Sequence, residues 1–214
     1  MKKFILILLV LFTLTGCRKV DSIMFKNEYE SLNNKDGYLD VNIPSDNPFI
    51  YITDEVLASK IENKEDLIVF FGFNKNPYVR SMIESLIQVS KDLNIDKIYY
   101  LDIYEIREEK KLNDQDEITI TKKGTDSYYK LLELLNDYID NYNINGNVYG
   151  KRINEPFILM IKDNNIIDGI SGISENLTSS KQEVTSEIKK DSYNIIYNYL
   201  KKYNENVCNV NEGC

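Results

Sequence analysis

The sequence predicts an α/β domain with a central mixed β-sheet, in the element order β-α-β-α-β-α-β-β-α. Three observations support this prediction. Short apolar runs alternate along the chain with longer segments whose apolar residues recur every three to four positions. Such alternation requires crossover connections between parallel strands. Two late apolar runs are separated only by the turn residues 162–165, and this hairpin adds an antiparallel edge.

The first strand and helix are expected at residues 49–52 and 53–61. The strand segment is short and apolar. Thr53 is suited to cap the following helix because its hydroxyl oxygen can accept a backbone hydrogen bond. Residues 67–71 form a continuous apolar run, which is typical of a strand buried on both faces of a sheet.

A longer amphipathic helix is expected from Asn76 to about Asn94. Asn76 and Pro77 suit an N-cap and a first helical turn, and apolar residues then recur at helical spacing. A third strand is expected at residues 97–103. The charged stretch that follows is expected to be a loop with one small strand, at residues 118–120.

The next helix is expected to begin at Asp126 or Ser127 and to extend to Tyr142, with its apolar residues along one face. The remaining elements are expected at residues 157–161 (a strand), 166–167 (its return strand) and 184–203 (a terminal amphipathic helix).

The N-terminus has the features of a lipoprotein signal peptide. Two lysines precede an apolar run from Phe4 to Leu14, which falls short of the roughly 20 residues that a spanning helix needs. The sequence Leu14-Thr15-Gly16-Cys17 then resembles the bacterial lipobox. This resemblance implies cleavage after residue 16, a diacylglyceryl group on Cys17, and a lipid anchor at the extracytoplasmic face of the cell membrane. An uncleaved short anchor, or a signal peptide with a chance cysteine, is the alternative.

The domain organisation follows from this segment and from polarity. Residues 1–16 are expected to be the signal peptide. The polar residues 17–46 are expected to form the lipidated N-terminus and a tether, part of which could fold back as an edge element. The α/β domain is expected over residues 47–204, and residues 205–214 form a tail that contains Cys208 and Cys214.

Two motifs resemble thioredoxin-fold proteins of the bacteriocin-transport-accessory type. Residues 71–80 read Phe-Gly-Phe-Asn-Lys-Asn-Pro-Tyr-Val-Arg and resemble the stretch F-G-x-x-x-C-P-Y-C-R of these proteins. Residues 152–157 resemble their cis-proline loop, and residues 162–165 resemble the turn after the next strand. The segment 123–135 resembles the helix between the two motifs. The resemblance covers roughly residues 48–203 and implies a thioredoxin-like fold.

Asn76 and Val79 occupy the positions of the two cysteines. In redox-active members the first cysteine lies at a helix N-terminus, which lowers its pKa and favours the thiolate. An amide cannot attack a disulfide, and valine cannot resolve a mixed disulfide. The resemblance therefore implies no thiol–disulfide exchange at this position, but it leaves a groove that could bind an extended peptide. The expected lining residues are Phe73, Asn76, Tyr78, Val79, Glu155 and Pro156. Alternatively, Pro156 only maintains a bend and Tyr78 is only a surface aromatic.

The composition argues against several classes of function. The chain has no histidine, so Ser-His and Cys-His nucleophiles and the commonest metal ligand are missing. The formal net charge of −8 argues against nucleic acid as a partner. No metal or other cofactor is expected, because the polar run 113–117 lacks the pattern of a calcium-binding loop.

Cys208 and Cys214 are expected to form a structural disulfide, as paired cysteines outside the cytoplasm usually do. Free or intermolecular thiols, and a redox role for the tail, stay open. The leading hypothesis is a membrane-anchored lipoprotein without a redox-active cysteine pair that binds or positions extracytoplasmic proteins or peptides. The alternatives are a thiol–disulfide oxidoreductase accessory that uses Cys208 and Cys214, and a structural envelope protein without a groove.

Overall fold

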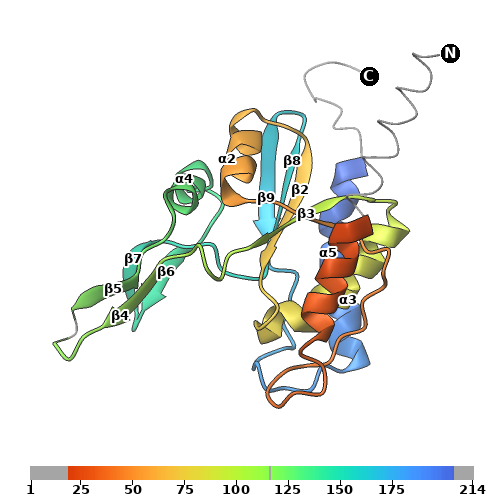
Figure 1. The fold of residues 1–214 in the computed structure, drawn as a ribbon, viewed down its shortest axis with the longest axis horizontal. Helices are drawn as coiled ribbons and strands as arrows, with labels where there is room; N and C mark the ends of the chain where they lie inside the picture. The colour runs from red at the N-terminus through yellow and green to blue at the C-terminus, as the bar shows by residue number, and fades with distance from the viewer. Residues whose placement is uncertain (1–18, 116, 205–214) are drawn as a thin grey trace.

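The computed structural model describes residues 19–115 and 117–204, and its centre is a five-stranded sheet (Figure 1). Strands β1 and β2 pair in parallel with β3, and β8 pairs antiparallel with β2 and β9. The α/β class and the mixed sheet are therefore as the sequence predicts. In sheet order the strands are β1 (Phe49–Tyr51), β3 (Ile98–Asp102), β2 (Leu67–Gly72), β8 (Phe157–Lys162) and β9 (Asn165–Ile170).

Helices cover both faces of this sheet (Figure 1). One face carries α3, α5 and a helix that the structure describes over residues 19–30. The other face carries α2 and α4, which contact each other. The labelled helices are α2 (Asp54–Glu62), α3 (Pro77–Asp92), α4 (Asp126–Leu134) and α5 (Ser186–Asn204).

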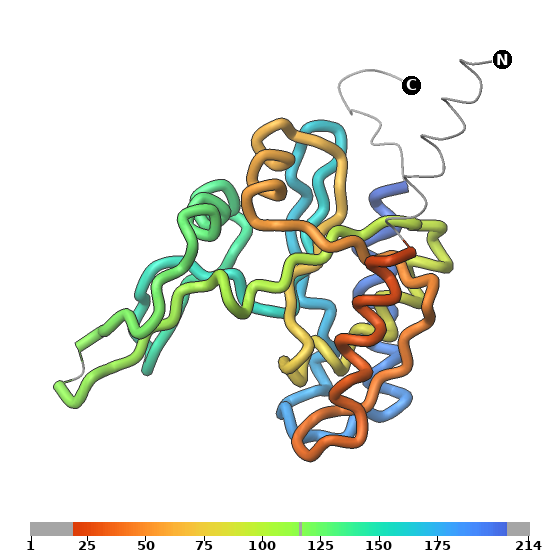
Figure 2. The backbone as a smooth tube through the Cα atoms, in the orientation of Figure 1, coloured from red at the N-terminus to blue at the C-terminus, as the bar shows by residue number. Residues whose placement is uncertain are grey.

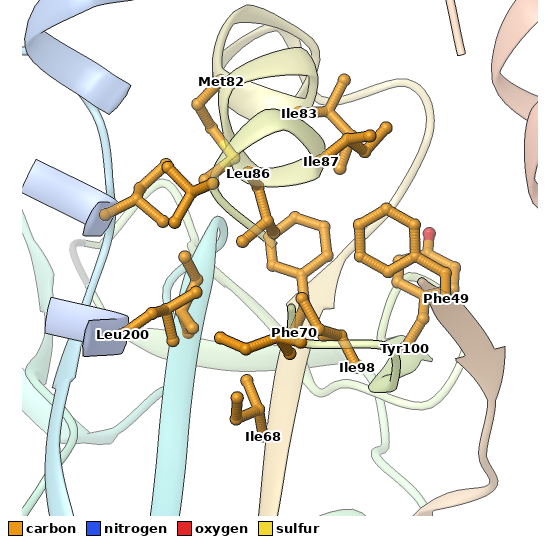
Figure 3. Packing of buried hydrophobic residues seen from close by; sticks show 14 of the residues in the cluster. Phe49, Ile68, Phe70, Met82, Ile83, Leu86, Ile87, Ile98, Tyr100 and Leu200 are labelled. Atoms are coloured by element: carbon orange, nitrogen blue, oxygen red, sulfur yellow. The ribbon is translucent and has the colours of Figure 1, made fainter. Parts of the chain in front are cut away.

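Each face of the sheet has its own apolar core. Ile68 and Phe70 of β2 belong to the core beneath α3 and α5, where the Phe70 ring centroid lies 5.8 Å from that of Phe49 and 5.9 Å from that of Tyr100 (Figure 3). Phe71 belongs to the core beneath α2 and α4. Every residue of β2 is buried, which confirms the prediction of a strand enclosed on both faces.

The N-terminal segment is part of the domain, so the predicted tether is wrong for residues 19–46. Phe25 and Tyr29 are fully buried, and the Phe25 ring stacks on Phe49 with centroids 4.1 Å apart. Val41 and Ile43 are buried in the same core. The apolar residues of this segment are few, but their helical spacing places both aromatic rings on one face.

Two β-hairpins project from the domain on the side away from α3 and α5 (Figure 2). They are β4 (Glu109–Leu112) with β5 (Ile118–Lys122), and β6 (Asn141–Ile144) with β7 (Asn147–Lys151). The small strand predicted at residues 118–120 lies within β5, but its partner strand was expected to be loop.

The helix predicted from Asp126 or Ser127 to Tyr142 is too long, because α4 ends at Leu134 and Tyr142 lies in β6. The hairpin turns at Asn145 and Gly146, whose φ angles of 50° and 85° are those of a tight hairpin turn. This turn allows β6 and β7 to pair. The spacing of apolar residues up to Tyr142 by itself predicts that the helix continues there.

Candidate functional site

The N-terminus of α3 meets the residue before Pro156. The Asn76 side chain caps α3, because its Oδ1 accepts hydrogen bonds from the backbone N–H groups of Tyr78 (2.8 Å) and Val79 (3.3 Å). Its Nδ2 donates to the carbonyl oxygen of Glu155 at 3.3 Å. The Glu155–Pro156 peptide bond is cis. One amide side chain thus links the two segments that the sequence analysis placed in one site.

A cavity of about 410 Å³, here called the polar cleft, opens beside this contact. It lies between the start of α3, strand β6 and the segment before β8. Most of its lining side chains are amides and phenols, which offer both hydrogen-bond donors and acceptors. The lining residues are Asn76, Tyr78, Asn141, Tyr142, Asn143, Arg152, Asn154 and Glu155.

A second cavity, of about 440 Å³, shares Asn154 and Glu155 with the polar cleft. Pro156 lines this second cavity, together with residues of β9 and of the chain just before β6. Residues 152–156 belong to no strand pair in the described part of the chain. This segment, which pairs with no strand, therefore lines both cavities.

The six expected groove residues divide into two groups. Asn76, Tyr78 and Glu155 line the polar cleft, and Pro156 lines its neighbour. Val79 is fully buried in the core beneath α3, and Phe73 is only 8% exposed, so neither lines the two cavities. The lining residues that β6 contributes were missed because β6 was expected to be helix. The Asn-Gly turn between β6 and β7 was the sequence signal that could have found them.

Glu155 is held by a buried ion pair. Its carboxylate pairs with the guanidinium of Arg107, and the two side chains are only 7% and 11% exposed. The Arg107 guanidinium also lies over the Phe73 ring, 4.9 Å from the centroid, and near the Tyr104 ring. Because Arg107 neutralises it, the Glu155 carboxylate fixes the loop before Pro156 and adds no net negative charge to the polar cleft.

Among the described residues, Arg152 is the only Lys or Arg whose side chain lines the polar cleft. Its guanidinium carbon lies 4.6 Å from the ring centroid of Tyr142. Among the ion pairs between described residues, none includes Arg152. The cleft therefore presents one stacked guanidinium that no carboxylate of the described chain neutralises.

Two partly buried carboxylates lie outside both cavities. Burial raises the pKa of Glu28, which accepts a hydrogen bond from the Tyr51 hydroxyl, and the charge of Asp102 raises it further. Burial also raises the pKa of Asp102, at the end of β3, although the backbone N–H of Tyr104 donates to its Oδ1 at 2.8 Å. Glu28 connects the first helix to β1 through Tyr51, and we expect the ionisation of both acids to affect the stability of the domain.

The described residues give no support to a metal site or a membrane-spanning helix. Among residues 19–115 and 117–204, no group of three or more Cys, Asp or Glu side chains could hold a metal ion. In the run 113–117, the side chain of Asn113 instead accepts hydrogen bonds from the backbone N–H groups of Gln115 and Glu117 and closes a hairpin turn. No helix in the described ranges has both the length and the apolarity to cross a membrane.

All three cysteines, Cys17, Cys208 and Cys214, lie outside the described residues, so the structure bears on neither the lipidation nor the disulfide. Comparisons with models of protein families, with curated proteins and with solved structures find no match. The chemistry of the site therefore has to be argued from its own geometry: a polar cleft with one unpaired arginine, beside the contact between Asn76 and Glu155.

Proposed function

We propose that this chain is a thioredoxin-like lipoprotein without redox activity at the usual site, which binds or positions proteins or peptides at the extracytoplasmic face of the cell membrane. The observation that carries the proposal is the polar cleft beside the hydrogen bond from Asn76 Nδ2 to the Glu155 carbonyl oxygen. The sheet order supports the fold assignment, because β1, β3 and β2 run parallel and β8 and β9 form an antiparallel edge.

The unpaired segment before β8 favours recognition of an extended chain. Residues 152–156 lie outside the strand pairs of the described chain, and they contribute to the lining of both cavities. A client peptide that runs beside this segment would combine backbone hydrogen bonds with side-chain contacts in the two cavities. Strand addition of this kind is a common mode of peptide recognition.

The residues at the two cysteine positions argue against disulfide exchange here. Asn76 is committed to capping α3 and to its contact with Glu155, and Val79 is fully buried. Thiol–disulfide exchange begins with the attack of a thiolate, and none of the described residues that line the polar cleft is a cysteine. Binding without covalent chemistry is the activity that this cleft can support.

Site-specific photo-crosslinking in native membranes tests the binding proposal. A photoreactive benzoylphenylalanine replaces Tyr78, which lines the polar cleft, or Tyr129, which is exposed on α4 outside both cavities. We expect discrete crosslinked peptides from position 78 that are absent from position 129. The same products at both positions, or none at position 78, would contradict a client groove.

A disulfide reductase assay tests the alternative function. The full-length chain is compared with a variant in which Cys208 and Cys214 are both replaced by serine. We expect neither protein to reduce a disulfide substrate. Activity in the native chain that disappears in the double variant would mean that the tail is the working site, and the non-catalytic proposal would then be wrong.

A further inference from the structure

We propose that the polar cleft recognises a carboxylate on its client, and that Arg152 is the residue that binds it. This inference rests on the proposed function, since it names the client chemistry of the same cleft. An arginine side chain has five N–H donors in a planar fork that matches the two oxygens of a carboxylate. Its guanidinium lies over the Tyr142 ring and interacts electrostatically with Tyr128. Because it donates no side-chain hydrogen bond to another described residue, its N–H donors are available to a ligand.

The position of Arg152 is fixed without neutralising it. The backbone N–H of Arg152 donates to the carbonyl oxygen of Asp140 at 3.2 Å, which ties the start of the segment to the hairpin. The guanidinium stacks on Tyr142, and such stacking orients a cation while leaving its edge free to donate hydrogen bonds. A pre-positioned donor loses less side-chain entropy when a ligand binds.

The charges around the cleft leave Arg152 as the group that can attract an acidic ligand. Within residues 19–115 and 117–204, the only carboxylate that lines the cleft belongs to Glu155, and Arg107 pairs with it. The chain as a whole has a formal net charge of −8, so its general field repels acidic peptides. A single unpaired cation in the cleft therefore offers an acidic group a favourable local contact. Side-chain amides from Asn141, Asn143 and Asn154 supply further donors around it.

The test uses pools of fluorescent decapeptides with the purified full-length chain. All pools carry an acetylated N-terminus and uncharged residues at the random positions. Three amidated pools have Glu, Gln or Lys at a fixed central position, and a fourth has Gln there and a free C-terminal carboxylate. Comparison of the first and fourth pools distinguishes an acidic side chain from a chain terminus as the source of the carboxylate.

Four forms of the chain are compared by fluorescence polarisation. They are the native chain, Arg152→Gln, Tyr142→Leu, and Lys35→Gln, which removes an equal charge at an exposed position outside the cleft. For the native chain we expect a carboxylate pool to bind about tenfold more tightly than the amidated Gln pool, as a charge-assisted hydrogen bond would give. Arg152→Gln should abolish this preference, Tyr142→Leu should reduce it, and Lys35→Gln should preserve it.

Unfolding midpoints of the four forms confirm that each is folded. A fifth form, Tyr78→Ala, tests binding in the cleft itself. If every pool binds the native chain alike and Tyr78→Ala weakens the binding of all of them, the cleft binds peptides but the carboxylate inference is overturned. A carboxylate preference that survives in Arg152→Gln also overturns it, because the cation must then lie elsewhere. If no pool binds the native chain, both the inference and the proposed peptide binding fail.

Discussion

Arg80 shows how much structure one buried side chain can organise. Only 2% of the residue is exposed, and burial lowers its pKa. None of the ion pairs between described residues includes Arg80. Its guanidinium donates instead to three backbone carbonyl oxygens, of Leu39 (2.5 Å), Tyr29 (2.9 Å) and Asn74 (3.2 Å), and to Oδ1 of Asn33 (2.9 Å). Arg80 thereby joins the N-terminal segment to α3, close to the candidate site.

We expect Arg80→Met to lower the free energy of unfolding by about 3 kcal/mol, because four acceptors inside the protein each lose a charged donor. Arg80→Lys should recover less than half of this loss, since a single ammonium cannot reach the same four oxygens. Urea unfolding of the full-length chain measures both effects. Gln88→Ala, at an exposed position of the same helix, is the control and should change stability by no more than about 0.5 kcal/mol. Full recovery by lysine would contradict the proposed role of the planar fork.

The ion pair between Glu155 and Arg107, beside the polar cleft, gives a second prediction. Glu155→Gln should lower the free energy of unfolding by about 3 kcal/mol, because it leaves the Arg107 charge buried and unpaired. The double variant with Arg107→Met should be more stable than the sum of the single changes predicts, and chemical denaturation measures this coupling. The exposed pair of Lys122 with Glu105 is the control, and Glu105→Gln should cost less than about 1 kcal/mol. Additive single effects would show that the pair is not coupled.

At the residue scale the sequence predicts that Asn76 and Glu155 lie in one groove, but it predicts neither their hydrogen bond nor the roles of the arginines. The two motifs of the family resemblance bring those residues together. Arg107 and Arg152 come from segments that were expected to be loop or that lay at the border of a motif, and only the folded hairpins place them at the site. A resemblance carries over the residues in its motifs, whereas ion pairs between distant segments depend on the fold.

At the scale of elements, two tight turns illustrate when a hairpin is visible in a sequence. Asp163 and Asn164 have positive φ angles and connect β8 to β9, as predicted. Asn145 and Gly146 do the same for β6 and β7, but the apolar spacing before them also fits a helix. The turn residues, not the periodicity, decided the structure in the second case.

The first helix gives the prediction that belongs to this scale. Phe25 is fully buried between Tyr29 and Phe49, so Phe25→Ala should lower the free energy of unfolding by about 3–5 kcal/mol. Met24 is 52% exposed on the same helix, and Met24→Ala should change it by no more than about 0.5 kcal/mol. Thermal or urea unfolding of the two variants makes the comparison. Equal, small effects would mean that the segment is a tether after all.

For the molecule as a whole, the α/β class and the mixed sheet follow from the alternation of buried strands and amphipathic helices. The extent of the domain does not. Residues 19–46 are mostly polar, and their few apolar side chains, such as Phe25 and Ile43, pack into a core formed largely by the rest of the chain. Their burial therefore cannot be predicted from the segment alone. Local pattern therefore predicts the sheet and its covering helices, while the domain boundary depends on contacts between distant segments.

The carboxylates of Glu28 and Asp102 predict how the stability of the whole domain depends on pH. Burial raises the folded-state pKa of each acid above its unfolded-state pKa. At a pH between the unfolded-state and the folded-state pKa of either acid, the folded protein therefore binds more protons than the unfolded protein. Their contribution to stability is therefore fully present below the unfolded pKa and is lost as the pH rises through the folded pKa. We expect Glu28→Gln to be more stable than the native chain at pH 7, since glutamine carries no charge to bury.

This advantage should disappear below about pH 4, where the native carboxyl is also neutral. The measurement is the free energy of unfolding of both proteins over that range. Glu175→Gln, at an exposed position, serves as the matched control and should show no such trend. If the difference between Glu28→Gln and the native chain is constant with pH, the ionisation of Glu28 does not determine it.

The folded N-terminal segment limits how far the domain can reach. If Cys17 carries the lipid, as we propose, a single residue separates the anchored position from the described helix at residue 19. One residue of extended chain spans at most about 3.5 Å, so a lipid on Cys17 would hold the domain close to the bilayer. The domain would then bind only proteins close to the bilayer surface. Such proteins would either extend from the membrane or lie against it. A flexible insert between Cys17 and residue 19 would let the domain reach proteins farther from the bilayer.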